Sequence, residues 1–363
     1  MRILRNYILL ECVAPFLTAL SALTCVFLLG YLVKLANLVI NKGVSLLMVG
    51  KVFALYVPVL LTYTLPLACL IGVILTFSRM SADNEIMAIR ASGVLLRRLL
   101  TPLIAAGIVL SLITFILNDR VIPYAYHEQR ATLKNIGVSN PTALLEPGIF
   151  ITAFEGQVLF IHKVEDNRLY NITIYQPQPD GKPTRTIIAR EGEFTSVPGE
   201  DKVILKLLNG TSDEVDINDP GKFYKLNFNT LFITLDLSQN REKVDKKPRE
   251  MSLKELTAEI DRLEALLVDV SRLKTEYHRK ISWSLTPLIF ILMAFPLAVI
   301  TNKREKSANV LIAGLCAAAY YLLVLGSEAL SIEKIAPAYL VMWTPPVIGL
   351  SVAAYLNYRM IKK

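Results

Sequence analysis

The chain has 363 residues, of which 53% are hydrophobic and 19% are charged, and its mean hydropathy is +0.45. These values exclude an ordinary water-soluble globule and favour a membrane protein. The formal net charge of +8 would suggest nucleic-acid binding in a soluble protein. However, residues 119–280 hold 23 basic and 25 acidic residues, and the rest of the chain holds 16 and 6. The excess of positive charge therefore lies in the spans and their short loops, where it indicates membrane topology. We expect no nucleic-acid partner.

Six apolar stretches are long enough to cross a bilayer, whose hydrocarbon core needs about 20 residues of helix. Short segments on one side of these spans carry twelve Lys and Arg residues, and those on the other side carry four. The positive-inside rule therefore predicts that both termini are cytoplasmic and that the long segment after the third span is extracytoplasmic. The six predicted spans are residues 12–33, 52–78, 99–118, 281–302, 307–327 and 335–358.

The long segment after the third span has short alternating runs, and turn dipeptides such as Asp180-Gly181 and Asn209-Gly210 separate them. This pattern predicts an all-β domain, either a sandwich or a jelly roll, with a plain stack of hairpins as the alternative. The predicted strands include residues 158–164, 169–175, 203–208 and 231–237.

A capping-box pattern at Ser252 and Glu255 follows the β segment and precedes an apolar stripe that continues to Leu273. It predicts an amphipathic helix that lies along the membrane surface or, alternatively, packs under the β domain.

The predicted fold is an α-helical membrane protein with six transmembrane helices in a 3+3 arrangement and an inserted extracytoplasmic jelly-roll-like β domain. The domains are expected at residues 1–120 for the first three helices, 121–251 for the β domain, 252–276 for the amphipathic helix and 277–363 for the last three helices.

The cytoplasmic loop between the second and third spans contains a short helical pattern at about residues 81–93. Ser81 or Asp83 can cap its start, and Gly93 suits its end. One interpretation is a docking helix for another protein, and the other is a membrane-surface helix whose arginines only set topology. The candidate docking residues, which fall on neighbouring turns, are Glu85, Ile86, Ile89 and Arg90.

At residues 41–45, 79–93, 249–256 and 276–280 the sequence resembles the LptF/LptG permeases (YjgP/YjgQ) of lipopolysaccharide export, and it is more similar to the LptF side. The resemblance extends over essentially the whole chain. It implies a non-catalytic permease that pairs with a second LptF/LptG-type permease and with an LptB-like ATPase dimer, in the inner membrane of a Gram-negative bacterium.

The same resemblance implies that lipopolysaccharide leaves the inner membrane and passes through a periplasmic jelly roll to LptC-like and LptA-like proteins. It also implies that Glu85 contacts the ATPase, with Arg90 beside it on the same helix. Independently, the chain contains no G-x-x-x-x-G-K-[ST] motif. We therefore expect no cofactor in this chain, with ATP hydrolysed by a partner, and we expect no metal site.

Lipopolysaccharide carries phosphates, so a transporter needs cations at the outer rim of its spans. In the resembling family a Lys near the position of Lys34 contacts headgroup phosphate. The alternative for Lys34 is an interfacial lysine that reaches toward water, and the alternative for Arg279 is internal pairing with Glu276 and His278. The candidate phosphate-binding residues are Lys34, Lys42, Arg279 and Lys280.

Two other function classes are alternatives to the permease. An ion-coupled secondary transporter needs polar groups near the midplane of the membrane, but Glu11 and Glu328 lie near its interfaces, where a structural role is expected. A membrane-anchored enzyme needs a nucleophile with its base, or paired carboxylates, in the β domain. No such arrangement stands out there, so the permease is the favoured interpretation.

Overall fold

The computed structural model divides into two compact units, one comprising Met1–Leu32, Ala54–Glu128 and Lys246–Lys363, and the other Val33–Phe53 and Gln129–Asp245. Lys42 and the predicted turn at Asp180-Gly181 lie outside the described residues. The structure describes residues 2–40, 44–139, 148, 150–151, 157–165, 168–177, 184–196, 202–215, 223–236, 246–300 and 306–362.

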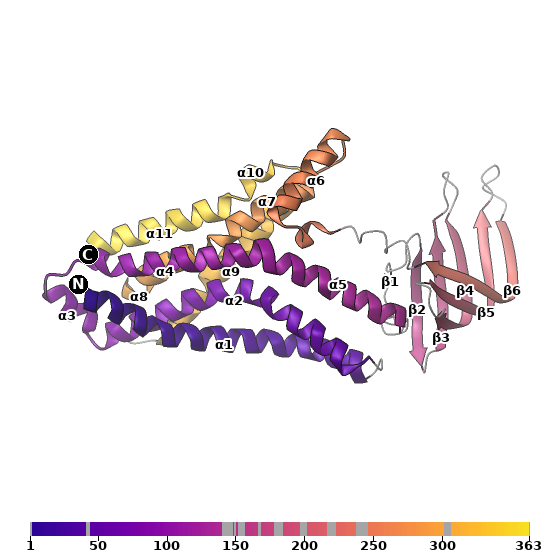
Figure 1. Cartoon of the computed structure of the whole chain (residues 1–363), viewed down its shortest axis with the longest axis horizontal. Helices are drawn as coiled ribbons and strands as arrows, with labels where there is room; N and C mark the ends of the chain where they lie inside the picture. The colour runs from indigo at the N-terminus through magenta and orange to yellow at the C-terminus, as the bar shows by residue number, and fades with distance from the viewer. Residues whose placement is uncertain are drawn as a thin grey trace. The chain divides into compact units, whose positions relative to one another are not determined.

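The helical segments follow the predicted 3+3 order around the β strands (Figure 1). They are α1 (Arg2–Ile40), α2 (Leu46–Ala82), α3 (Glu85–Ala91), α4 (Leu96–Ile116), a π-helical turn η1 (Leu117–Val121), α5 (Ile122–Ser139), a 3-10 turn η4 (Pro248–Glu250), α6 (Leu253–Ala265), α7 (Ser271–Ser284), α8 (Thr286–Ile300), α9 (Lys306–Ile332), α10 (Ala338–Val341) and α11 (Thr344–Lys362).

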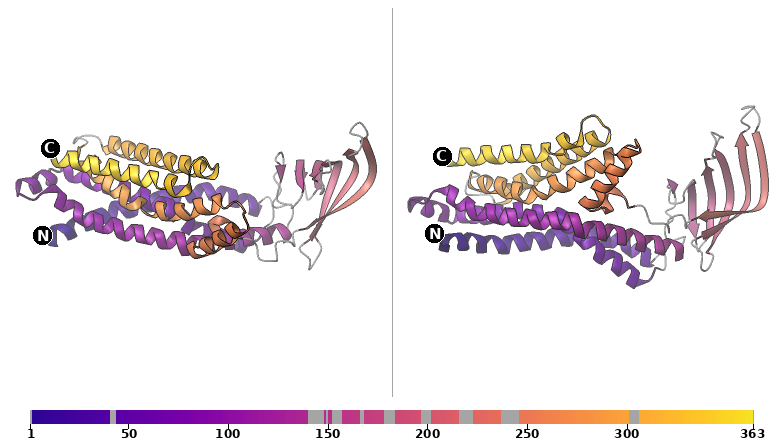
Figure 2. Two further views of the ribbon diagram at one scale, coloured as in Figure 1. Left: turned by 90° about the horizontal axis from the view of Figure 1, so that it is seen from above. Right: turned by 45° about the horizontal axis from the view of Figure 1, so that its top comes forward.

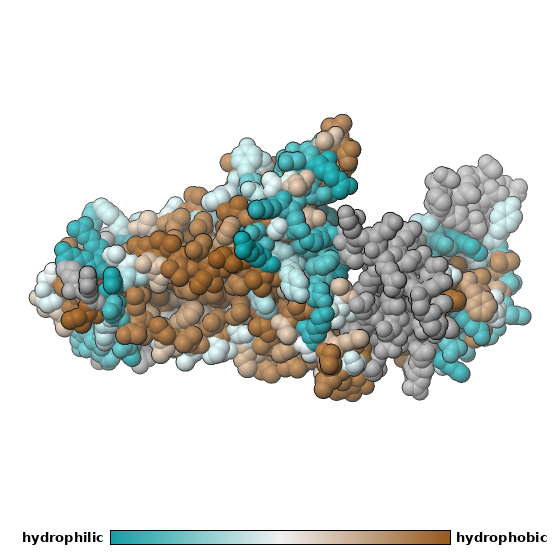
Figure 3. All heavy atoms as spheres, viewed as in Figure 1, coloured by the Kyte–Doolittle hydropathy of each residue, from teal (hydrophilic) through white to brown (hydrophobic). Residues whose placement is uncertain are grey.

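Six segments of the described residues are long and apolar enough to cross a membrane, which confirms the predicted number of spans. On the face shown in Figure 3, apolar residues cover much of the middle of the helical unit, and hydrophilic residues gather at the end that holds the chain termini. The segments are Ile3–Ile40, Leu46–Ala82, Leu96–Leu133, Ser271–Val299, Leu311–Ile332 and Ala338–Met360.

The core of the helical unit lies where α2 and α4 pack against α8. Phe77 and Phe295 are fully buried there, with ring centroids 4.7 Å apart in an edge-to-face arrangement. Gly107 of α4 faces Leu288, where a Cβ would come within 2.8 Å of a leucine methyl group. Such small residues let membrane helices approach closely.

The chain termini and α3 lie at one end of the helical unit (Figure 1). This end is called the terminal end below.

The predicted amphipathic helix is interrupted, which corrects the expectation of one continuous element over residues 252–276. Its start is as predicted, because Ser252 and Glu255 form both bonds of the capping box. However, α6 ends at Ala265, Leu267 adopts a left-handed φ of 57°, and the Val268 N–H donates to the Leu263 carbonyl. This is a Schellman end without glycine.

The β strands form one antiparallel sheet in which neighbours in sequence are neighbours in space, and the sheet is strongly curved (Figure 2). Its buried side is lined by aliphatic residues such as Leu159, Ile172 and Leu205, all 0% exposed. A β domain is thus confirmed, and consecutive hairpins build it. The strands are β1 (Phe150–Ile151), β2 (Val158–Glu165), β3 (Arg168–Gln176), β4 (Arg185–Ser196), β5 (Lys202–Val215) and β6 (Phe223–Asp236).

The Asn209-Gly210 dipeptide does not form the predicted turn, because both residues lie inside β5. Asn209 has a left-handed φ of 53°, which asparagine tolerates better than most residues. A Cβ on Gly210 would lie 2.4 Å from the Ile188 carbonyl oxygen of the neighbouring strand. The dipeptide therefore permits a left-handed backbone conformation inside a long strand, whereas the sequence pattern predicted that the strand ends there.

Candidate functional site

The short helix predicted in the loop between the second and third spans is present as α3, seven residues long, at the terminal end (Figure 1). Its N-cap is Asn84, with a left-handed φ of 59° and no side-chain capping bond, so the predicted caps Ser81 and Asp83 were wrong. Its end is as predicted: Gly93 has a φ of 81°, and its N–H donates to the Arg90 carbonyl.

Two of the predicted docking residues face the helical core instead of solvent. Ile86 is 6% exposed within the main core cluster, and Ile89 packs against the same cluster. Their spacing of three residues does mark one face of the helix, but this face attaches α3 to the bundle. The exposed side of α3 instead presents Met87, which is 55% exposed, beside Arg90.

Glu85 is the point at which α3 meets α1. The Tyr7 hydroxyl of α1 donates a hydrogen bond to Glu85 Oε2 at 2.9 Å. One turn further along α1, Glu11 forms an ion pair with Arg79 at the end of α2. α1 thus makes one polar contact with α3 itself and one with the end of α2, which precedes α3 in the chain.

Sequence reasoning missed Tyr7 and Arg79 as members of this site. Tyr7 and Glu11 are four residues apart on one helix face, which is a weak signal. Their partners lie 78 and 68 residues away along the chain. Only the packing of three helices brings them together.

A second polar cluster lies at the opposite end of the helical unit, around the π-helical turn η1. The Lys280 ammonium donates to the carbonyl oxygens of Asn118 at 2.9 Å and Met251 at 2.7 Å. The Asp119 carboxylate accepts from the Leu253 N–H at 2.7 Å. A π-helical turn leaves backbone carbonyls without their usual helical partners, and here a lysine satisfies one of them.

Arg279 is paired inside the same cluster. Its Nε and Nη2 donate to the two carboxylate oxygens of Glu276 at 2.9 and 2.8 Å, and the side chains are 15% and 7% exposed. Lys280 is 3% exposed. The internal pairing predicted as the alternative for Arg279 is therefore present, with Glu276 as the partner.

Lys34 has a different environment. It lies near the end of α1 and is exposed.

Glu11 and Glu328 are each in an ion pair. Glu11 pairs with Arg79, and Arg249 contacts Glu328 Oε1 at 3.1 Å. Neither carboxylate is an isolated intramembrane charge, as expected for structural roles.

These features define a multi-pass membrane protein of 3+3 spans with an inserted antiparallel β domain. The sequence profile of the family described as "Lipopolysaccharide export system permease LptF/LptG" matches residues 6–359. The chain belongs to this family, which confirms the resemblance found in the sequence.

Curated relatives with the name "Lipopolysaccharide export system permease protein LptF" match the chain over almost its whole length. The protein of Escherichia coli strain K12 is 22% identical over 361 residues, which cover 98% of this chain and 94% of the relative. The protein of Shigella flexneri matches with the same identity and coverage. The match therefore includes both halves of the helical unit and the β insertion.

Proposed function

We propose that this chain is a permease subunit of a lipopolysaccharide exporter in the inner membrane of a Gram-negative bacterium. Family membership over residues 6–359 supports this function. The structural observation that carries it is α3, a short helix at the terminal end that is hydrogen-bonded to α1 and packed against the helical core, with Met87 and Arg90 on its exposed side. Such a helix can transmit force from a bound protein to the spans.

The proposed partner at α3 is an LptB-like ATPase dimer, and a second LptF/LptG-type permease completes the membrane part. ATP is hydrolysed in the ATPase chains, and this chain is not an enzyme. In this proposal Glu85 is the residue at which ATPase contact reaches α1, because its carboxylate already accepts the Tyr7 hydroxyl. Met87 and Arg90 supply the exposed contact surface, while Ile86 and Ile89 hold the helix in place.

The proposed orientation places the terminal end in the cytoplasm and the β domain in the periplasm, which the distribution of Lys and Arg supports. The β domain then passes lipopolysaccharide to LptC-like and LptA-like proteins. Lys34, and with it Lys42, would meet headgroup phosphates at the outer rim. Near that rim Lys280 is buried and Arg279 is paired with Glu276, so they brace η1, η4 and α7 instead of binding phosphate.

Co-purification of the ATPase tests the proposal. Glu85→Arg should abolish retention of the ATPase by the tagged chain, because it reverses the charge at the start of α3 and removes the acceptor for Tyr7. Asp83→Arg is a matched control two residues earlier, at an exposed acidic position outside α3. Equal retention in wild type and Glu85→Arg would contradict the coupling role of α3.

A further inference from the structure

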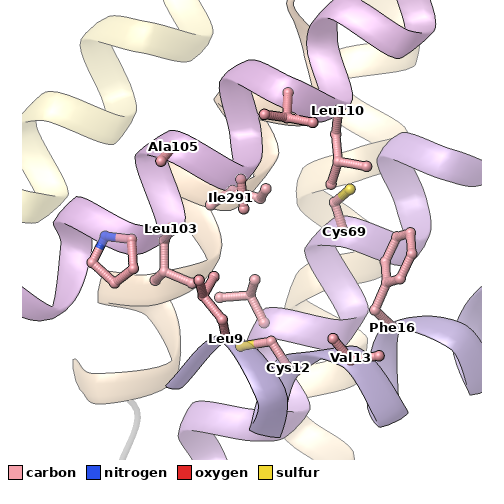
Figure 4. A pocket seen from close by; sticks show the side chains of 13 residues that line it. Leu9, Cys12, Val13, Phe16, Cys69, Leu103, Ala105, Leu110 and Ile291 are labelled. Carbon is pink, nitrogen blue, oxygen red and sulfur yellow. The ribbon is translucent and has the colours of Figure 1, made fainter. Parts of the chain in front are cut away.

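An apolar groove of about 460 Å³ opens between α1 and α4 in the helical unit (Figure 4). Its floor is buried, with Cys69 and Val73 of α2 and Ile291 of α8 all at most 5% exposed. Its rim is exposed, with Val13 at 48% and Val109 at 56%. The groove therefore opens at the side of the bundle, where a membrane protein meets lipid.

Water cannot fill this groove, because its lining offers almost no hydrogen-bonding groups. An empty groove would lose the dispersion contacts of its lining. A cavity of about 150 Å³ holds the six carbons of benzene, so by proportion this groove holds on the order of 18 carbons. Its size suits one fatty acyl chain.

The depth of the groove matches one leaflet. On α1 its lining runs from Leu9 to Phe16, and on α4 from Pro102 to Leu110. At 1.5 Å per residue these stretches are about 10 and 12 Å long. Half of a bilayer core is about 15 Å thick, so the groove takes up most of the leaflet on the terminal side.

Each wall of the groove has an exposed arginine at the terminal side. Arg5 precedes Leu9 by four residues on α1, and Arg98 precedes Pro102 by four on α4. Residues four apart share a helix face, so each arginine lies on the groove side of its helix, one turn closer to the terminal end than the lining. Guanidinium groups bind phosphate oxygens well.

We propose that the groove is a binding site for a phospholipid of the cytoplasmic leaflet, with one acyl chain between α1 and α4 and its phosphate near Arg5 and Arg98. The leaflet assignment rests on the proposed orientation, but the site is separate from the lipopolysaccharide path. A helix of a second permease would fill an apolar groove equally well, but only a phospholipid also brings a phosphate to the end at which both walls carry an arginine. The pairing of apolar walls with two cationic ends favours the lipid.

The site adjoins the segments that hold α3. Cys12 of the groove follows Glu11, the partner of Arg79, and Leu9 follows Tyr7 by two residues. A bound acyl chain would fix the spacing of α1 and α4 beside these contacts. Lipid binding would thereby set how rigidly α3 is mounted.

Native mass spectrometry of the full chain with its co-purifying subunits tests the site. After detergent exchange, wild type should retain about one phospholipid per copy more than Ala106→Phe, which fills the groove from α4. Ala318→Phe, at an exposed alanine of α9 outside the groove, should retain the wild-type number. Equal retention in wild type and Ala106→Phe would overturn the proposal, whether or not the transport function holds.

The headgroup contact is tested separately with 1-palmitoyl-2-oleoyl phosphatidylglycerol. Arg5→Gln with Arg98→Gln should weaken retention of this lipid several-fold, whereas Arg359→Gln at the end of α11 should not. If Arg5→Gln with Arg98→Gln leaves retention of this lipid unchanged, the placement of the phosphate near these two arginines is wrong.

A photoreactive benzoylphenylalanine at Val109 identifies the occupant directly. A covalent adduct with the mass of one phospholipid supports the proposal, and an adduct to another protein chain contradicts it.

Discussion

The hydrogen bond between Tyr7 and Glu85 should control how firmly α3 is held. Tyr7→Phe removes the hydroxyl that donates to Glu85 Oε2 at 2.9 Å and keeps the ring. Hydrogen bonds to charged groups contribute about 1.5–3 kcal/mol. Tyr7 is 37% exposed, so water competes for the carboxylate, and a value of about 1 kcal/mol is more appropriate here. This corresponds to about a fivefold change in the equilibrium for local opening of α3.

Hydrogen–deuterium exchange of the peptide that contains α3 measures this opening. The amides of Ala88 and Ser92, which donate to the carbonyls of Asn84 and Ala88, should exchange about five times faster in Tyr7→Phe. Exchange in the β strands should be unchanged. Tyr355→Phe is the matched control, since Tyr355 is 63% exposed on α11. Unaltered exchange in α3 would refute the idea that this bond holds the helix.

Three further outcomes are expected. Glu276→Leu should destabilise the chain by about 3–5 kcal/mol in thermal unfolding, because it leaves the buried Arg279 guanidinium unpaired. The double variant Glu276→Leu with Arg279→Leu should recover most of this stability. No recovery would mean that Arg279 has another essential partner. Hydrogen bonds from Ser271, and then Lys334, lower the pKa of Asp269 to about 2. The bonds from Ser271 at the start of α7 to this carboxylate should therefore persist above about pH 4 and be lost as the pH falls toward 2. Exchange of the α7 amides, corrected for intrinsic rates, should show this dependence, and Asp269→Asn should abolish it. Lys34→Asp should reduce photocrosslinking to lipopolysaccharide without loss of assembly, whereas Lys334→Asp should not; unchanged crosslinking would leave Lys34 as an interfacial lysine.

Patterns that repeat along the chain were predictable. The six spans follow from apolar length alone, the β domain from alternation, and the end of α3 from Gly93. The break between α6 and α7 was not predictable. A glycine in the left-handed position normally indicates the end of a helix, but here Leu267 occupies that position.

The candidate site was predicted only in part. That a short helix lies in the loop after the second span, with Glu85 on it, followed from the loop sequence. The contact role of Glu85 came only from the family resemblance. Which face of α3 is exposed did not, because an apolar pair such as Ile86 and Ile89 suits a docking surface as well as a core. The contacts of Tyr7, Arg79 and Lys280 join segments far apart in the chain, and packing of the helices decides them.

The energy source is the central claim about function, and reconstituted transport tests it most directly. Proteoliposomes that hold this chain with its co-purified permease and ATPase should transfer lipopolysaccharide to a photocrosslinking residue at Thr230 of the β domain when ATP is supplied. They should not do so with a proton gradient alone. Transfer that proceeds without ATP, or that survives removal of the ATPase, would contradict the account.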